Sequence, residues 1–147
     1  MAVGRICSRI TATASPDETV RAAARRMAKY GVGTLVVLQE DRGRGARAVG
    51  LITDRDIAVR CVAESLDPGE VRVSEVMSAP VHSVSDDTPI EEALARMVSA
   101  GTRRLVVTSD GDRVAGILTV DDVLDLIARE AAAIGHVLEK QQPHVPV

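Results

Sequence analysis

The heptapeptide GLITDRD at residues 50–56 occurs a second time in the chain, as GILTVDD at residues 116–122. Both copies read Gly, two apolar residues, Thr, two variable residues and Asp. The apolar pair suits a buried strand, and Thr and Asp favour helix starts because their side-chain oxygens accept from free N–H groups. Each copy therefore predicts a strand that runs into a helix. Because the first turn of a helix also favours bound anions, Thr and Asp could serve a ligand or only cap their helices.

The residues before each copy are duplicated as well. SPDE at residues 15–18 and TPIE at residues 88–91 each offer a hydroxyl cap, a proline and a glutamate, which predicts two helix starts. Each helix carries an apolar stripe and ends at a glycine, Gly31 or Gly101. The stripe residues are Val20, Ala23, Ala24, Met27 and Ala28, and then, 70 residues later, Ile90, Ala93, Leu94, Met97 and Val98.

The predicted strands and turns follow the same order. LVVL at residues 35–38 matches LVV at 105–107, and the polar turn at 39–47 has a shorter counterpart at 109–113. A further helix is expected from about residue 54 to 64. This internal duplication predicts an α/β (α+β) fold. The expected division is a first repeat at 1–66, a second at 67–130 and a C-terminal helix extension and tail at 131–147.

Composition limits the possible classes of protein. The chain has 147 residues, of which 46% are apolar, and a net charge of −3, which argues against nucleic acid as the main ligand. No apolar run is long enough to span a membrane, and Met1–Arg5 lacks the apolar core of a signal peptide. Cys7 and Cys61 do not make a disulfide framework. These features predict a cytoplasmic chain with inert, buried thiols.

The paired Gly-x-x-Thr-x-x-Asp segments, each preceded by Leu-Val-Val, resemble a tandem pair of CBS domains, the Bateman module, over roughly residues 4–130. TDRDI at residues 53–57 is typical of small stand-alone CBS-pair proteins in bacteria. The resemblance implies two β-α-β-β-α repeats packed about a pseudo-twofold axis. It also implies two clefts between the repeats, which in many members hold AMP, ADP, ATP, NAD or S-adenosylmethionine.

The resemblance also implies a role for each site residue. The carboxylates of Asp56 and Asp122 would accept from ribose hydroxyls, and Thr53 and Thr119 would contact ribose or phosphate. Each cleft would combine the motif of one repeat with the first strand and the pre-strand residues of the other. One cleft would hold Thr11, Val32, Gly33, Thr119 and Asp122, with Arg103 or Arg104 near the phosphate. The other would hold Val81, Thr102, Arg103, Thr53, Arg55 and Asp56.

The two expected clefts differ in charge. Arg55 precedes the motif aspartate in the first copy, where the second copy has Asp121. Thr34 precedes the first Leu-Val-Val strand, where Arg104 precedes the second. Each cleft therefore has a basic residue in a different place, and Asp121 should disfavour a long polyphosphate.

The final helix carries a second apolar stripe with the 3,4,3,4 spacing of helices that pair. It consists of Leu124, Ile127, Ala131, Ile134 and Leu138; Gly135 weakens it, and Pro143 is expected to end the helix. The cover for this stripe would be either the chain's own second repeat or the same helix of another subunit. The second alternative, a homodimer, is the one we expect.

Two functions remain open. The first is a regulator that binds an adenosine nucleotide and signals to a separate, unidentified protein. The second is a constitutive dimerisation module whose clefts bind nothing. Neither His82, His136 nor His144 has metal-ligand spacing, and no set of catalytic residues is apparent. We therefore expect neither a metal site nor an enzyme.

Overall fold

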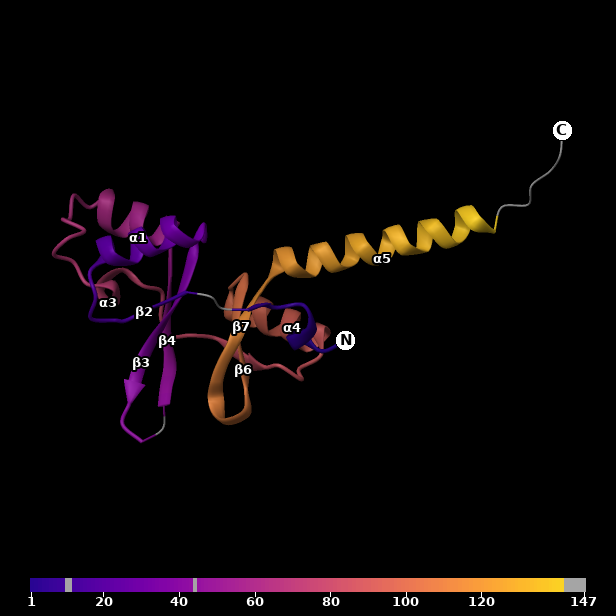
Figure 1. The fold of residues 1–147 in the computed structure, drawn as a ribbon, viewed down its shortest axis with the longest axis horizontal. Helices are drawn as coiled ribbons and strands as arrows, with labels where there is room; N and C mark the ends of the chain where they lie inside the picture. The colour runs from indigo at the N-terminus through magenta and orange to yellow at the C-terminus, as the bar shows by residue number, and fades with distance from the viewer. Residues whose placement is uncertain (10–11, 44, 142–147) are drawn as a thin grey trace.

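The computed structural model describes residues 1–9, 12–43 and 45–141, and it confirms the duplicated β-α-β-β-α order. Figure 1 shows two lobes, with the last helix projecting away from them. The first repeat contains β2 (Thr13–Ala14), α1 (Val20–Tyr30), β3 (Thr34–Asp41), β4 (Gly45–Thr53) and α2 (Asp54–Ile57). The second repeat contains β5 (Ser83–Ser85), α4 (Ile90–Ala100), β6 (Arg104–Ser109), β7 (Arg113–Thr119) and α5 (Val120–Lys140).

Each repeat builds one sheet. In the order β2-β3-β4, the first pair is parallel and the second antiparallel. The other sheet has the order β1-β7-β6-β5, in which β5 and β6 are parallel and β1 (Ser8–Arg9) is added to the edge of β7. Register shifts fall at equivalent places, after Val37 in β3 and after Val107 in β6. The two repeats thus share their backbone irregularities as well as their elements.

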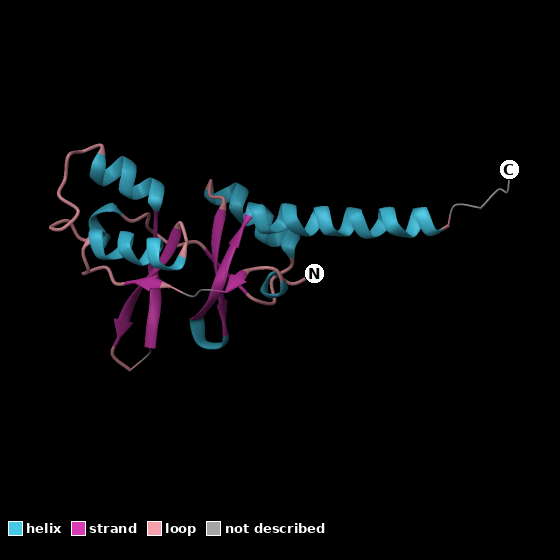
Figure 2. Ribbon diagram, turned by 45° about the horizontal axis from the view of Figure 1, so that its top comes forward, coloured by secondary structure: helices cyan, strands magenta, loops and turns pink. Residues whose placement is uncertain are grey.

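The sheets face each other, and the helices cover their outer sides (Figure 2). Between the sheets lies a buried cluster centred on Val36, Val106 and Ile117, with Leu51 packed against it. Val36 and Val106 are equivalent residues of β3 and β6, and both are fully buried. Burying one such side chain contributes about 1.5–3 kcal/mol. This cluster holds the two repeats together around the space in which the clefts lie.

Two short segments cross from one side of the molecule to the other. Val3, from the 3-10 helix η1 (Val3–Arg5), is buried in the core of the second repeat. Val73 and Val76, from α3 (Val73–Val76), are buried in the core of the first. We call residues 2–9 and 72–78 the crossing segments. Each core is completed by the segment that precedes the first strand of the other repeat.

The expected start of α1 at Ser15 is wrong. Residues 15–18 form a turn, and the helix begins at Val20 with Thr19 as its cap, whose hydroxyl accepts from the Ala22 N–H at 3.2 Å. The Val20 N–H donates to the Val71 carbonyl at 2.9 Å. The segment that leads into α3 thus supplies an acceptor that the local sequence pattern cannot reveal.

The expected cap of α4 is wrong for the same reason. Thr88 does not cap the helix; the N-cap position is Pro89, which makes no side-chain hydrogen bond. The first helical N–H, that of Ile90, donates to the Met1 carbonyl at 3.1 Å. Met1 and Val71 are 70 residues apart, and each immediately precedes a crossing segment, so the two helices are satisfied in the same way.

The helical stripes are narrower than expected. Ala28 is exposed and Val98 is 82% exposed, and only the residues with i, i+3 and i+7 spacing are buried in each helix. The predicted polar turn at 39–47 is also wrong: β3 and β4 continue through most of it as an antiparallel ladder. The predicted helix at 54–64 is shorter, since α2 passes into a π-helical turn, η2 (Ala58–Val62), that ends at Val62.

The prediction that the last helix runs on is confirmed, since α5 extends to Lys140 and includes Gly135. Its apolar stripe is not covered by the second repeat. Leu124 is 55% exposed, Ile127 58% and Ile134 61%. The expected end at Pro143 lies outside the described residues.

Candidate functional site

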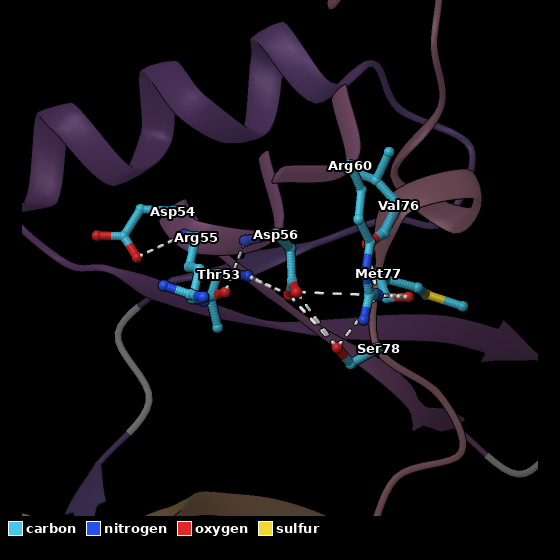
Figure 3. A network of polar contacts seen from close by, with 8 residues as sticks. All are labelled: Thr53, Asp54, Arg55, Asp56, Arg60, Val76, Met77 and Ser78. Atoms are coloured by element: carbon cyan, nitrogen blue, oxygen red, sulfur yellow. Dashed lines mark hydrogen bonds and ion pairs between the residues drawn. The ribbon is translucent and has the colours of Figure 1, made fainter. Parts of the chain in front are cut away.

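The first motif forms a capping box where β4 runs into α2 (Figure 3). The Thr53 hydroxyl accepts from the Asp56 N–H at 3.0 Å, and Asp56 Oδ2 accepts from the Thr53 N–H at 3.0 Å. This arrangement satisfies two N–H groups that the end of a helix leaves free. Capping therefore uses one carboxylate oxygen of Asp56 and leaves Oδ1 for another partner.

The outer oxygen of Asp56 faces the second crossing segment. The Ser78 hydroxyl lies 3.4 Å from Oδ1, and the Arg60 guanidinium lies 3.8 Å from it. Arg60 also donates to the carbonyls of Val76 and Met77 at 3.1 and 3.0 Å (Figure 3). The Asp56 side chain is only 13% exposed. Hydrogen bonds to this shielded charge are therefore stronger than they would be in water.

The second motif repeats the box with fewer partners. Asp122 Oδ2 accepts from the Thr119 N–H at 2.7 Å and from the Thr119 hydroxyl at 2.8 Å. Its Oδ1 accepts from the Ser8 hydroxyl at 3.2 Å. Leu126 stands at the position of Arg60, and among the described residues Asp122 forms no ion pair within 4.0 Å. Asp122 Oδ1 therefore has one protein donor, Ser8, whereas Asp56 Oδ1 has two polar neighbours, Ser78 and Arg60.

The motif glycines allow the crossing segments to lie against the sheets. A Cβ atom at Gly116 would be 2.6 Å from the Ser8 carbonyl oxygen. At Gly50 it would be 2.5 Å from Met77 Sδ and 3.1 Å from the Ser78 carbonyl oxygen. Any larger residue would push the segment, and its serine, away from the carboxylate.

The first cleft is a cavity of 240 Å³ between the repeats. It brings together the predicted residues Val32, Gly33 and Thr119, while Thr11 lies outside the described residues. Asp122 does not line it. Its carboxylate lies one hydrogen bond behind Ser8 and lines a separate hollow of 120 Å³. The residues lining the first cleft are Ser8, Arg9, Ala12, Val32, Gly33, Thr34, Ile117 and Thr119.

The second cleft is the pseudo-symmetric counterpart and measures 270 Å³. It includes the predicted residues Val81 and Thr102, and also Arg104, which the sequence placed near the phosphate of the other cleft. Thr53 and Asp56 lie behind its wall, joined to it through Ser78. The residues lining the second cleft include Leu51, Ser78, Pro80, Val81, His82, Thr102 and Arg104.

The remaining predicted residues line a third space, which we call the central cavity. It measures 460 Å³ and is lined by Arg55, Arg103, Arg104, Thr119 and Asp121. Arg103 lies 3.9 Å from Asp121, and both side chains are exposed. The structure thus gathers the three predicted arginines in one cavity. Arg104 lines the second cleft as well, and the first cleft has Arg9, which the sequence analysis did not name.

Two residues, Cys7 and Arg26, have pKa values shifted from their ordinary range. Burial raises the pKa of the Cys7 thiol, and the nearby Arg9 partly opposes that shift. The pKa of Arg26 is raised because its guanidinium donates to the Glu18 carboxylate, with Nη2 3.0 Å from Oε2, beside a hollow of 640 Å³. Cys61 is fully buried, as predicted, whereas Cys7 is half-buried. The raised pKa of Cys7 disfavours its reactive thiolate form.

Ser8, Ser78 and His82 are site residues that the sequence analysis did not identify. Ser8 and Ser78 contact the motif carboxylates, and His82 lines the second cleft. A signal for the serines existed. VGRICS at residues 3–8 and VSEVMS at 73–78 share Val and Ser at the same 70-residue offset.

Within the described residues, no three His, Cys, Asp or Glu side chains are grouped as a metal site would need. None of the described helices combines the length and the apolar character required to cross a membrane.

A tandem pair of β-α-β-β-α repeats with clefts between them defines the class of this protein, and comparison with known proteins gives the family. The CBS domain family model matches residues 3–62 and 73–129. The chain therefore belongs to the CBS-domain family and contains two copies of that domain.

Three known proteins illustrate the likeness. The uncharacterized protein MK0525 of Methanopyrus kandleri is 33% identical over 142 residues, which is 97% of this chain and 70% of that protein. The CBS domain pair of protein MJ0100, solved in complex with 5′-methylthioadenosine and S-adenosyl-L-methionine, has a TM-score of 0.73 and 26% identity, covering 88% of this chain and 98% of that one. A hexameric CBS-CP12 protein from bloom-forming cyanobacteria has a TM-score of 0.73 and 25% identity, covering 84% of this chain and 69% of that one.

Proposed function

We propose that this protein is a regulator that binds an adenosine nucleotide between its repeats and signals to a separate partner protein. The observation that carries the proposal is that each cleft is lined by both repeats. A ligand that touches both walls binds one relative arrangement of the repeats better than others. It thereby shifts the population toward that arrangement, and a partner can read the change.

The first cleft suits the uncharged part of such a ligand. Ala12, Val32 and Ile117 offer an apolar surface for adenine. The Thr119 hydroxyl would turn from Asp122 Oδ2, to which it donates at 2.8 Å, toward ribose or phosphate. A ribose hydroxyl could reach the outer oxygen of Asp122 by replacing Ser8. The complex of the MJ0100 pair with two adenosine compounds supports this ligand class. AMP, ADP, ATP and NAD are the further candidates.

Thermal denaturation with each candidate at millimolar concentration tests the proposal. A ligand that binds only the folded state at 100 times its Kd adds about 2.7 kcal/mol of stability. For a domain of this size that corresponds to roughly 5–10 °C in Tm. Calorimetry should then give the Kd of the ligand that acts. If neither AMP, ADP, ATP, NAD nor S-adenosylmethionine raises Tm, the proposal is wrong.

A constitutive interaction module is the second candidate, and one observation favours it. Both motif carboxylates already have protein donors on both of their oxygens, from the capping boxes and from Ser8 and Ser78. In this alternative the carboxylates only stabilise the fold. It predicts no Tm shift with any nucleotide, and removal of either carboxylate would lower stability alone.

We also propose that the chain forms a homodimer through α5. Ile134 is 61% exposed and Leu138 is also 61% exposed, on a helix that projects from the body (Figure 1). A chain cut after about residue 128 should become monomeric in sedimentation experiments. In the full chain, Ile134→Glu with Leu138→Glu should do the same, while Ala133→Glu on another side of the helix should not. If the truncated chain stays dimeric, the contact lies elsewhere, for example at Val98 on α4.

No chemical turnover is part of this proposal. Nucleotide incubated with the protein should be recovered unchanged by chromatography. Steady hydrolysis that a cleft substitution abolishes, and that mock preparations lack, would show an enzyme.

A further inference from the structure

One basic cavity lies between the two clefts. The central cavity of 460 Å³ is lined from one repeat by Arg55, in α2, and from the other by Arg104, the first residue of β6, and by Arg103 just before it. Asp121 is the one acidic side chain among its lining residues. Three guanidinium groups against one carboxylate make this space a strong attractor of anions.

The central cavity adjoins both clefts. It shares Thr119 with the first cleft and Arg104 with the second. Each cleft alone, at 240 and 270 Å³, is smaller than the range of about 300–1,000 Å³ typical of ligand pockets. Either cleft together with the central cavity falls within that range. A ligand with an uncharged head in a cleft and an anionic tail would therefore place its tail in the central cavity, whichever cleft holds the head.

The positive charge of this cavity is largely available. Among the described residues, Arg55 and Arg104 form no ion pair, and Arg103 lies 3.9 Å from Asp121 with side-chain exposures of 74% and 79%. Such an exposed pair contributes little and breaks easily. Guanidinium groups bind phosphate oxygens in a fork geometry, which makes arginine suited to phosphate recognition.

The two repeats contribute unequally to the charge of the central cavity, which contains both Arg55 and its equivalent Asp121. The positions equivalent to Arg55, Arg103 and Arg104 hold Asp121, Gly33 and Thr34. The pseudo-twofold axis therefore relates the two clefts but not their charges.

We infer that the central cavity is a single phosphate-binding site that the two clefts share. It holds one polyphosphate chain at a time, because a second chain in the same cavity would bring like charges together against the same three arginines. Two ATP molecules therefore compete through their phosphates, whereas two uncharged adenosines do not. The anion site stands on its own geometry, and its sharing by nucleotides rests on the proposed function.

Inorganic tripolyphosphate is the probe for the anion site. Calorimetry of the unmodified protein should show one tripolyphosphate per chain, with an affinity that falls as salt is raised. Arg55→Ala and Arg104→Ala should each weaken binding about tenfold, since each removes a charge-assisted contact. Asp121→Asn should strengthen it about threefold. Arg96→Ala, which removes an exposed charge on α4, should change it less than twofold and is the control. Absence of binding, or an equal effect of Arg96→Ala, overturns the inference.

Two further measurements test the sharing. In the unmodified protein, adenosine should titrate to two per chain and ATP to one. Val32→Trp should fill the first cleft, and Thr102→Trp, at the equivalent position, should fill the second. Thermal denaturation checks that both variants are folded. In each variant, tripolyphosphate should raise the apparent Kd of ATP at least tenfold and leave that of adenosine unchanged. Displacement of ATP in only one of the two variants, or two ATP per chain of equal affinity, overturns the inference.

The outcomes separate this inference from the proposed function. If tripolyphosphate binds with the stated arginine dependence but neither ATP nor adenosine binds, the nucleotide proposal fails and the anion site stands. If nucleotides bind but tripolyphosphate neither binds nor competes, the shared site is wrong and the nucleotide proposal stands.

Discussion

Two pairs of equivalent residues distinguish the clefts: Ala12 lines the first where His82 lines the second, and Thr34 lines the first where Arg104 lines the second. The backbones around the two clefts correspond closely, down to the register shifts and the serine that faces each motif carboxylate. The side chains that line them do not. Caps, motif glycines and buried valines set the shape of a cleft, whereas the lining residues set its chemistry.

The two clefts should therefore differ in what they hold best. The first has an apolar wall of Ala12, Val32 and Ile117, which favours an uncharged ring. The second has the imidazole of His82 in place of Ala12, which favours a polar group. Each cleft also has one guanidinium among its lining residues, Arg9 in the first and Arg104 in the second. The carboxylates behind them differ too, since Arg60 neighbours Asp56 whereas the equivalent position beside Asp122 is Leu126.

Removing the motif carboxylates should have the largest effect. Asp122→Ala and Asp56→Ala should each lower nucleotide affinity in one cleft by about 2–4 kcal/mol, or roughly 30- to 1000-fold, through loss of charge-assisted bonds to ribose. We expect Asp122→Ala to matter more for AMP, because it serves the more apolar cleft. Stability should fall by only about 1 kcal/mol, the typical cost of losing a helix cap. Calorimetry and denaturation of the same variants measure both.

Asparagine variants separate the two roles of these carboxylates. Asp122→Asn keeps an oxygen that can accept from the Thr119 N–H, as Asp122 Oδ2 does at 2.7 Å, but removes the charge. It should spare most of the stability and still weaken nucleotide binding. If the unmodified protein binds nucleotide and neither alanine variant weakens it, the ribose assignment is wrong.

The motif glycines should give the next largest difference between the clefts. Gly116→Ala places a methyl group 2.6 Å from the Ser8 backbone carbonyl, which cannot move without disturbing β1. A loss of about 1–3 kcal/mol is expected from such overpacking. Gly50→Ala meets mainly the flexible end of Met77, at 2.5 Å, and should cost less, about 1 kcal/mol. Urea denaturation gives both values.

Gly135→Ala provides the control of opposite sign. Nothing lies within 4 Å of a Cβ atom at this helical position. Alanine should therefore stabilise the chain by about 0.5–1 kcal/mol.

Equal losses of stability for Gly50→Ala and Gly116→Ala would contradict the expected difference and show that the two crossing segments are held with the same rigidity.

The sequence was sufficient for the parts of the fold that depend on local chemistry. The Leu-Val-Val strands, the αL glycines at residues 31 and 101 and the threonine caps of α2 and α5 are all confirmed. Each depends on neighbouring residues only. The helix starts at Ser15 and Thr88 were wrong because carbonyls of Val71 and Met1 satisfy those helices across the molecule. Such long-range acceptors leave no mark in a local pattern.

The candidate site was predictable to a similar degree. Val32, Gly33, Val81 and Thr102 line the clefts in the predicted repeats, since strand order fixes their place. Asp56 and Asp122 lie behind the residues that line the clefts. One carboxylate oxygen of each accepts from the capping threonine, and a serine hydroxyl donates to the other. This arrangement depends on the crossing segments, whose course only the structure shows.

The smallest difference between the clefts should come from the serines. Ser8 donates to Asp122 Oδ1 at 3.2 Å, and Ser78 lies 3.4 Å from Asp56 Oδ1. A ribose hydroxyl that binds Oδ1 of either aspartate must displace the serine hydroxyl from it. Ser8→Ala should therefore tighten AMP binding in the first cleft about two- to threefold, equivalent to about 0.5 kcal/mol. Ser78→Ala should do less in the second cleft, because Arg60 still neighbours Asp56. Calorimetry of the single variants, with Ser99→Ala on α4 as the control, can resolve these changes. A tenfold loss of affinity in Ser8→Ala would instead mean that the serine itself binds the ligand and that Asp122 only orients it.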